Sequence, residues 1–422
     1  MAPTDQMLMP SGGNSQAAPQ DVPGQAEAKW VSLRPFLRDI LIPFGATRLM
    51  LLVIAWLSLQ QIQTIPHSGA WEIGAGGQIV NVENRPLNTD NILVNAWGRW
   101  DSAWYYSVAK FGYHFVPGQQ SNTAFFPLYP LLIRALHFVW PSETDRSWFF
   151  CGVLVSNIAL LVALSYLYAA TKEQIDEGTA QRAVLYMLVF PSTLYYSAIY
   201  TEGLFVACAI AALYYGQKGR WWLAGFIAAG ASLTRSPGVV LGVPLAFEYM
   251  RQRRFRLTAI RWDVLAFLFI PLALAAFSYY LYVKTGNAFA TRDAQFAWGL
   301  RSSEKMWPWN AFTSYFTKPI AIHGAPNSLI DLGVTLLFLA AALVSIIKLR
   351  AIYSIYACAT WFFVTSWGSL GSMLRYVLVL FPCFVVFAVW GRNRIFHQVY
   401  LAVGTGLAAF FMILFVHWRW VG

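Results

Sequence analysis

The stretch WFFCGVLVSNIALLVALSYLYAA, residues 148–170, decides the fold of this chain. It contains no charged residue, and its length matches the ~20 residues that an α-helix needs to cross a hydrocarbon core of ~30 Å. Its apolar residues are continuous, whereas a strand of a membrane barrel would alternate apolar and polar residues. Since only helices and closed barrels satisfy the backbone inside lipid, the stretch predicts a membrane-spanning helix.

Comparable apolar runs recur from about residue 36 to the end of the chain. Of the 422 residues, 58% are hydrophobic and 12% are charged, whereas a soluble domain carries about 25% charged residues. We therefore predict an all-α, polytopic integral membrane protein with one transmembrane domain over residues 36–422. A polar segment rich in Ala, Gln, Pro, Gly and Ser predicts a disordered cytoplasmic tail over residues 1–35. The eleven predicted membrane helices are 36–60, 148–170, 181–199, 201–216, 221–235, 237–250, 262–284, 327–348, 351–366, 373–390 and 398–417.

Basic residues between the apolar runs set the predicted orientation. The densest basic cluster lies at residues 251–261, and smaller clusters lie at 218–220, 348–350 and 392–394. Because cytoplasmic loops carry an excess of Lys and Arg, we place these clusters in the cytoplasm. Topology then explains the net charge of +11, and no nucleic-acid partner is predicted.

The segment between the first two predicted helices, residues 61–147, is predicted to be a long external loop. It is much longer than an ordinary connection between helices, and it mixes Trp and Tyr residues with Arg99, Asp101 and Lys110. An aromatic belt at the membrane interface would explain the Trp and Tyr residues alone. The interspersed charges favour an active-site loop, in which residues 125–140 form an interfacial or re-entrant helix.

The Cys and His residues follow no pattern of a disulfide framework or a metal site. All four Cys residues lie inside apolar runs, and the six His residues are scattered without ligand spacing. No metal site is predicted and no cofactor is assigned.

Five short motifs follow one another along the chain. They are WGRWDSAWYY at 97–106, FFPLYP at 125–130, YTEGLF at 200–205, GRWWLAG at 219–225 and TRSPG at 234–238. Through these motifs, in this order, the chain resembles the PIG-V family of mannosyltransferases. These enzymes are related to the one that adds the second mannose of the GPI-anchor precursor, and the family has bacterial relatives. The resemblance runs from about residue 40 to residue 390, and we expect a bacterial member.

The resemblance implies a GT-C type fold, with many membrane helices, which the apolar runs number at about eleven, and a first external loop that bears the catalytic carboxylate. It also implies transfer of mannose, with inversion at the anomeric carbon, from a polyprenyl-phosphate-linked donor to a lipid or glycan acceptor. Membrane lipids, the donor and the acceptor are the expected partners, and no protein partner is assigned. The expected location is the inner (plasma) membrane for a bacterial protein and the endoplasmic reticulum for a eukaryotic one.

Asp101 is the candidate catalytic base. Sugar transfer from a lipid phosphosugar needs a group that takes the proton of the acceptor hydroxyl, and a carboxylate within hydrogen-bond reach can do so. Two structural roles would also explain Asp101. It could form an ion pair with Arg99, or it could cap the N-terminus of a helix that follows it.

Eight further residues are candidate substrate-binding residues. Arg matches phosphate oxygens with its planar fork, and aromatic rings can stack on a sugar. Snorkelling to the interface would also explain the arginines at helix ends, a helix dipole would explain Glu202, and packing would explain the aromatic residues. Arg48, inside the first helix, is expected to pair with Asp39 or a lipid phosphate. The eight candidates are Arg99, Trp100, Trp104, Lys110, Tyr129, Glu202, Arg235 and Arg375.

Two other functions remain open at this point. A transporter or flippase of lipid-linked sugars would show inverted repeats with broken helices in matched halves, and no clear inverted repeat is visible. A GT-C enzyme with another sugar, or with a protein acceptor, is disfavoured only by the set of motifs.

Overall fold

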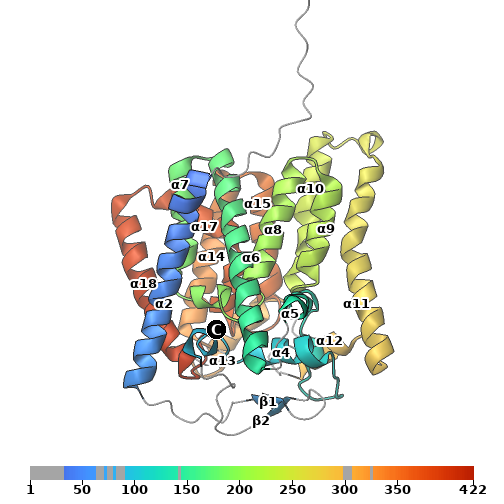
Figure 1. Ribbon diagram of the computed structural model, residues 1–422. Helices are drawn as coiled ribbons and strands as arrows, with labels where there is room; N and C mark the ends of the chain where they lie inside the picture. The colour runs from blue at the N-terminus through green and yellow to red at the C-terminus, as the bar shows by residue number, and fades with distance from the viewer. Residues whose placement is uncertain are drawn as a thin grey trace, which may run out of the picture. The chain divides into compact units, whose positions relative to one another are not determined.

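The computed structural model describes residues 33–62, 71–73, 79–81, 91–140, 144–297, 307–323 and 327–422. The described chain begins with the short helix α1 (Leu33–Pro35), three residues before the predicted first helix, and the rest of the predicted tail lies outside the described residues. From Leu33 onward the described chain is a bundle of helices that run roughly parallel or antiparallel to one another (Figure 1).

Five continuous helical stretches in the described chain are long and apolar enough to cross a membrane. The first joins α1, the π-helix η1 (Phe36–Leu41) and α2 (Ile42–Gln61). The third joins η6 (Trp262–Leu268) to α11 (Phe269–Thr285). These stretches confirm the prediction of an integral, multi-pass, all-α membrane protein. The five are Leu33–Gln61, α6 (Asp145–Gln174), Trp262–Thr285, α14 (Leu329–Lys348) and α18 (Arg394–Val416).

The other predicted spans also coincide with helices, but these helices are shorter or broken. They are α7 (Glu177–Val189), α8 (Glu202–Gln217), α9 (Trp221–Ser232), η4 (Ser236–Leu241) with α10 (Gly242–Gln252), α15 (Ala351–Thr365), and α16 (Met373–Tyr376) with η8 (Val377–Val379) and α17 (Phe381–Trp390). The number of membrane crossings, eleven, therefore stays a prediction.

Proline explains the two largest departures from the predicted spans. The predicted span 181–199 is wrong beyond Val189, because α7 ends before Pro191 and only the 3-10 turn η3 (Thr193–Tyr196) follows. Phe190 has an extended ψ of 143°, as a residue before proline prefers. The predicted span 373–390 bends by 86° where α17 begins, and Pro382 stands at the first turn of that helix. At both breaks, backbone N–H and C=O groups lose their helical partners and need hydrogen bonds from other groups.

Arg48 on α2 supplies hydrogen bonds to the backbone and side chains at the first of these breaks. Its guanidinium donates to the carbonyls of Leu188 and Thr193 at 3.0 and 3.1 Å, and to the hydroxyls of Thr193 and Ser197 at 2.9 and 3.1 Å. The expected pairing of Arg48 with Asp39 is wrong, since Asp39 pairs with its neighbour Arg38.

The predicted external segment 61–147 corresponds closely to the connection between α2 and α6. It contains the short strands β1 (Trp71–Ile73) and β2 (Ile79–Asn81), which pair antiparallel, and the helices α3 (Ile92–Asn95), α4 (Ser102–Phe111), η2 (Asn122–Ala124) and α5 (Leu128–Val139). Helix α5 has 12 residues and is about 18 Å long. It is too short to cross the membrane alone, as the interfacial or re-entrant interpretation requires.

The elements of this connection lie together at one end of the bundle. In Figure 1 the strands, α4 and α5 occupy the lower end, with α12 (Ala290–Phe296) and α13 (Pro308–Thr317) from the later connection beside them. The predicted basic clusters lie at the opposite helix ends. Helix α8 begins at Glu202 and ends just before Lys218, about 24 Å away for its 16 residues. The bundle thus separates a basic end from an end rich in connecting helices.

Candidate active site

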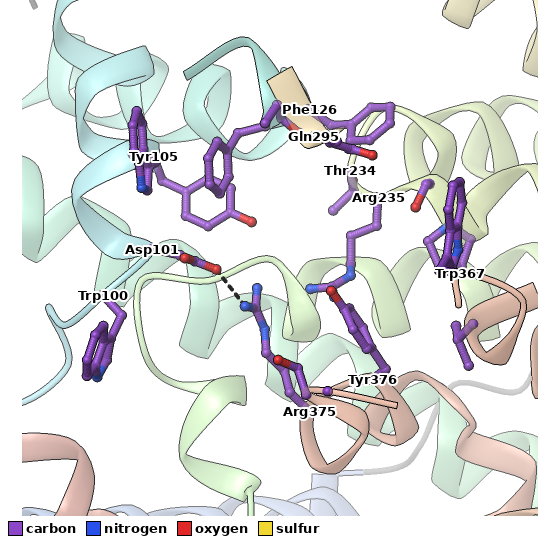
Figure 2. A pocket seen from close by; sticks show the side chains of 18 of the residues that line it. Trp100, Asp101, Tyr105, Phe126, Thr234, Arg235, Gln295, Trp367, Arg375 and Tyr376 are labelled. Atoms are coloured by element: carbon purple, nitrogen blue, oxygen red, sulfur yellow. Dashed lines mark hydrogen bonds and ion pairs between the residues drawn. The ribbon is translucent and has the colours of Figure 1, made fainter. Parts of the chain in front are cut away.

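A cavity of about 410 Å³ lies at the end of the bundle that carries α4 and α12 (Figure 2). Its wall combines segments that are far apart in the sequence, including the start of α4, the turn before α5, the turn between α9 and η4, and the segment around α16. The lining residues are Trp100, Asp101, Trp104, Tyr105, Gln120, Ala124, Phe125, Phe126, Thr234, Arg235, Ser236, Pro237, Gln295, Val364, Trp367, Ser369, Gly371, Ser372, Arg375, Tyr376 and Trp420.

Asp101 stands at the N-cap position of α4 and faces this cavity. Its side chain makes no capping hydrogen bond. Instead, its Oδ2 atom lies 2.6 Å from Nη1 of Arg375, 274 residues further along the chain, and the dashed line in Figure 2 marks this ion pair. Both structural roles considered for Asp101, a pair with Arg99 and a helix cap, are therefore absent. Within the described part of the chain Oδ1 has no hydrogen-bond partner, so this oxygen is available to a substrate.

Glu202 lies behind the cavity and joins two arginines. Its side chain is fully buried at the N-terminus of α8. One oxygen, Oε1, accepts from Nη1 of Arg235 at 2.5 Å and also from Nε of Arg375. The second oxygen, Oε2, has no hydrogen-bond partner among the described residues. A buried carboxylate that bridges two guanidiniums fixes both in place, as the desolvated charges need partners.

Both guanidiniums keep donors for a ligand. Arg235 also donates to the hydroxyl of Thr201 at 3.0 Å, and its guanidinium lies 5.5 Å from the ring centre of Tyr376. The guanidinium of Arg375 lies 4.5 Å from the ring centre of Tyr200. In the described chain, Nη2 of neither arginine donates a hydrogen bond. Two guanidiniums in one cavity suit a phosphate group, whose oxygens accept charge-assisted hydrogen bonds.

Tyrosine hydroxyls hold the backbone at the start of α4. The backbone N–H of Asp101 donates to the hydroxyl of Tyr200 at 3.1 Å, and this hydroxyl donates to the carbonyl of Arg99 at 3.0 Å. Tyr105 shares a hydrogen bond of 3.3 Å with Thr201. Burial raises the pKa of Tyr105 to about 12, so its hydroxyl stays protonated at neutral pH. Asp101 is thus held through its backbone as well as through Arg375.

Four predicted substrate-binding residues do not line the cavity: Glu202, which lies behind it, and three residues that lie further away. Arg99 is buried and donates to the carbonyl of Val416 at 3.2 Å. Lys110 pairs with Asp145 at 2.6 Å. Tyr129 is fully buried and bonds to the hydroxyl of Ser156 at 2.7 Å and the carbonyl of Gly152 at 2.9 Å. Internal partners satisfy each of these groups, so a direct contact with substrate is not supported by the geometry.

The other predicted site residues converge. Asp101, Trp100, Trp104, Arg235 and Arg375 line one cavity, and Glu202 bridges the two arginines behind it. Sequence reasoning missed Gln295, Trp367 and Trp420, which also line the cavity. None of these belongs to a motif, although Gln295 lies in the segment between α11 and α14. Between the predicted helices 262–284 and 327–348, residues 298–306 and 324–326 lie outside the described residues.

No group of three or more His, Cys, Asp or Glu residues that could hold a metal ion occurs in the ranges that the structure describes. The cavity lining includes the carboxylate of Asp101, the guanidiniums of Arg235 and Arg375, and several aromatic rings.

Two solved structures are similar to this chain. One is ArnT from Cupriavidus metallidurans bound to undecaprenyl phosphate, with a TM-score of 0.48 and 12% identity over 89% of this chain and 76% of that chain. The other is the oligosaccharyltransferase of Archaeoglobus fulgidus in the apo form, with a TM-score of 0.43 and 12% identity over 89% and 55% of the two chains.

Curated relatives match a smaller part of the chain at higher identity. The GPI alpha-1,6-mannosyltransferase 2 of Mus musculus is 30% identical over 157 residues, which is 35% of this chain and 30% of the mouse protein. The GPI mannosyltransferase 2 of Yarrowia lipolytica is 28% identical over 100 residues, 24% of this chain and 28% of the yeast protein. The matches thus span less than a third of these relatives, and the expected bacterial source stays a prediction.

The family model described as mannosyltransferase (PIG-V) matches residues 46–309, more than half of the chain. This range holds all five motifs and ends before Arg375. The chain belongs to the PIG-V mannosyltransferase family.

Proposed function

We propose that this protein transfers a mannosyl residue from a polyprenyl-phosphate-linked donor to a hydroxyl of a lipid or glycan acceptor. One observation carries this proposal. A carboxylate with an available oxygen, Asp101, shares a cavity with two guanidiniums, Arg235 and Arg375. The family supports a mannosyl group, and the apolar bundle around the cavity supports a lipid-linked donor.

Asp101 is the general base of the proposed reaction. Its Oδ1 atom takes the proton of the acceptor hydroxyl while the hydroxyl oxygen attacks the anomeric carbon of the donor sugar. The bond from this carbon to the phosphate oxygen breaks, and its electron pair leaves with the polyprenyl phosphate. Attack from the face opposite the leaving group inverts the anomeric carbon.

Arg235 and Arg375 hold the donor phosphate in this proposal. Charge develops on the leaving phosphate as the glycosidic bond breaks, and fixed guanidinium donors stabilise it without rearranging. Glu202 fixes both guanidiniums in advance, since its Oε1 atom contacts both. Trp100 and Trp104 contribute aromatic walls to the same cavity.

The proposed reaction takes place at the extracytoplasmic face. The basic clusters lie at the opposite ends of helices whose other ends reach the cavity. Lys348 ends α14, for example, and Asp331 in the first turn of that helix bonds the backbone of Leu374 beside Arg375. The helix has 20 residues and is about 30 Å long, close to one hydrocarbon thickness. The positive-inside rule then favours a cavity that faces away from the cytoplasm.

The substitution Asp101→Asn tests the proposed base. It keeps the shape of the side chain but removes the proton acceptor, so we expect kcat to fall by about 10²–10⁴-fold. The measurement is transfer of radiolabelled mannose from a polyprenyl-phosphate donor by the purified protein in lipid nanodiscs, with thermal unfolding measured in parallel.

Asp145→Asn is the matched control. It also removes an Asp carboxylate from an ion pair in the same connection, but the pair with Lys110 lies outside the cavity lining. We expect this variant to keep its kcat. Full turnover by Asp101→Asn would refute the base assignment. If the unchanged protein moved lipid-linked sugar across vesicles but transferred none, the transporter interpretation would replace this proposal.

A further inference from the structure

The segment after α18 forms a wall of the cavity that no motif indicates. Trp420 lines the cavity, although it lies 319 positions after Asp101 in the sequence and outside the residues that the family model matches. Its ring stands 5.4 Å from that of Trp100, centre to centre, with an edge-to-face angle of 82°. Trp418 meets the same ring of Trp100 at 5.9 Å. Three tryptophans thus form one cluster beside the candidate base.

Arg99 joins this cluster to the segment that carries Asp101. Its Nε atom donates to the carbonyl of Val416, the last residue of α18, and its guanidinium lies 5.0 Å from the ring centre of Trp418. Further hydrogen bonds to the carbonyl and the side chain of Asn95 hold the other end of the guanidinium. From another segment, Nε2 of His323 lies 3.0 Å from the carbonyl oxygen of Trp420. The position of Trp420 is therefore fixed by contacts from two other segments.

The backbone at this cluster is strained. Trp100 and Trp418 have φ angles of 55° and 60°, in the left-handed region that bulky residues rarely adopt. Such conformations persist only where surrounding contacts impose them, and they concentrate at binding and catalytic sites. Here both strained residues are tryptophans, and their rings contact each other. Trp100 directly follows Arg99 in the chain, and Trp418 is contacted by the guanidinium of Arg99.

The tryptophan cluster lies on the acceptor side of Asp101. Figure 2 shows Trp100 on one side of Asp101, and Arg375, Arg235 and Trp367 on the other side. Since the arginines take the donor phosphate in the proposed reaction, the acceptor must approach the carboxylate from the side of Trp100. The aromatic wall is then the surface against which the acceptor lies.

We propose that Trp420 is a specificity-determining residue that packs against a sugar ring of the acceptor, and that Arg99 is a positioning residue that holds it there. The C–H face of a pyranose ring buries apolar surface against an indole ring, while its hydroxyls stay hydrated or bonded. This inference rests on the proposed function, because it assigns the acceptor side from the places of Asp101 and the arginines.

The test compares Trp420→Ala with Arg419→Ala, whose side chain is exposed in the same segment. The full-length protein in nanodiscs receives a polyprenyl-phosphate mannose donor and the best acceptor from a panel of octyl glycosides. We expect Trp420→Ala to raise the KM for the glycoside roughly tenfold, the loss typical of a truncated aromatic anchor. The KM for the donor and the kcat should stay unchanged, and Arg419→Ala should behave like the unchanged protein.

The same assay distinguishes a failure of the proposed function from a failure of the role of Trp420. If the unchanged protein transfers no mannose, the proposed function fails. If it transfers mannose and Trp420→Ala keeps the same KM for the glycoside, only the role of Trp420 is overturned. Transfer to octanol but to no glycoside of the panel would also overturn it, since a sugar ring would then gain nothing from the wall.

Arg99→Lys tests the positioning role. Lysine keeps the charge but loses the planar fork, so it cannot bond Val416 and Asn95 while covering Trp418. We expect Arg99→Lys to raise the acceptor KM about as much as Trp420→Ala does. The double variant should show no further rise, because both substitutions remove the same contact between Trp420 and the acceptor. A fall of kcat at unchanged acceptor KM would instead mean that Arg99 acts through Asp101, and would contradict the proposal.

Discussion

At the residue scale, Glu202 links the two arginines of the site. It is fully buried, and one of its oxygens contacts both Arg235 and Arg375. With Asp101 the group contains two carboxylates and two guanidiniums, so its formal charge is zero before substrate binds. An arriving phosphate therefore meets cations that are already compensated, and their main advantage is fixed geometry rather than excess charge.

The substitution Glu202→Gln should both destabilise the protein and change its response to anions. Removing one partner leaves buried guanidiniums uncompensated, which typically costs about 3–5 kcal/mol. Undecaprenyl phosphate would replace part of the missing negative charge. We therefore expect a lower Tm for the variant, and a larger rise of Tm on adding this lipid than the unchanged protein shows.

Glu248→Gln provides the comparison. Glu248 is also buried and also pairs with an arginine, Arg251, but this pair lies near the C-terminus of α10, at the basic end of the bundle. This variant should lose stability and yet respond to undecaprenyl phosphate as the unchanged protein does. Equal Tm rises for Glu202→Gln and Glu248→Gln would show that Glu202 has no special relation to the anion site.

The sequence predicted single residues of the site better than their partners. Asp101, Arg235 and Glu202 stand in motifs whose residue types suit the chemistry. The partner of Asp101 could not be predicted, because Arg375 is 274 positions away and only the folded bundle brings the two together. Arg99 stands in the same motif as Asp101 and was expected to bind substrate, but it contacts Val416 and Trp418 instead. Trp420 was missed because an aromatic residue after a membrane helix is typical of an interface belt.

At the scale of elements, hydrophobicity predicted where helices occur but not where they break. Apolar residues continue through Phe190 and Leu380, so the runs looked like whole spans. The chain instead leaves the helix at Pro191 and bends by 86° near Pro382. Proline cannot donate the helical hydrogen bond and restricts its predecessor, but whether a break occurs depends on partners that satisfy the freed backbone. Those partners come from other helices.

Arg48 is such a partner, and Arg48→Met should reveal its role. Methionine fills much of the space but leaves the carbonyls of Leu188 and Thr193 without their donor, each at a cost of about 1–3 kcal/mol. We expect a clear fall of the Tm in nanodiscs, with the KM for the donor unchanged. A variant of normal Tm that bound the donor more weakly would favour the alternative that Arg48 contacts a lipid phosphate.

At the scale of the whole molecule, the distribution of charge relates the site to the membrane. The cluster Arg251–Arg261 begins in the last turn of α10, whereas Arg235 stands before η4 at the other end of the same helical stretch, η4 with α10. Local sequence thus predicts the orientation only through the positive-inside rule, and the structure adds that the cavity lies one helix length from the basic end.

Cysteine labelling tests this orientation directly. Gln120 lines the cavity and is exposed, and Arg256 is exposed in the basic cluster. A membrane-impermeant maleimide added to intact cells should label Gln120→Cys, since the proposed orientation opens the cavity to the outside, but should label Arg256→Cys only after permeabilisation. The four native cysteines lie in helices and are buried or half-buried, so the unchanged protein measures their background. The reverse pattern would place Asp101 and both arginines on the cytoplasmic side, where an extracytoplasmic acceptor could not reach them.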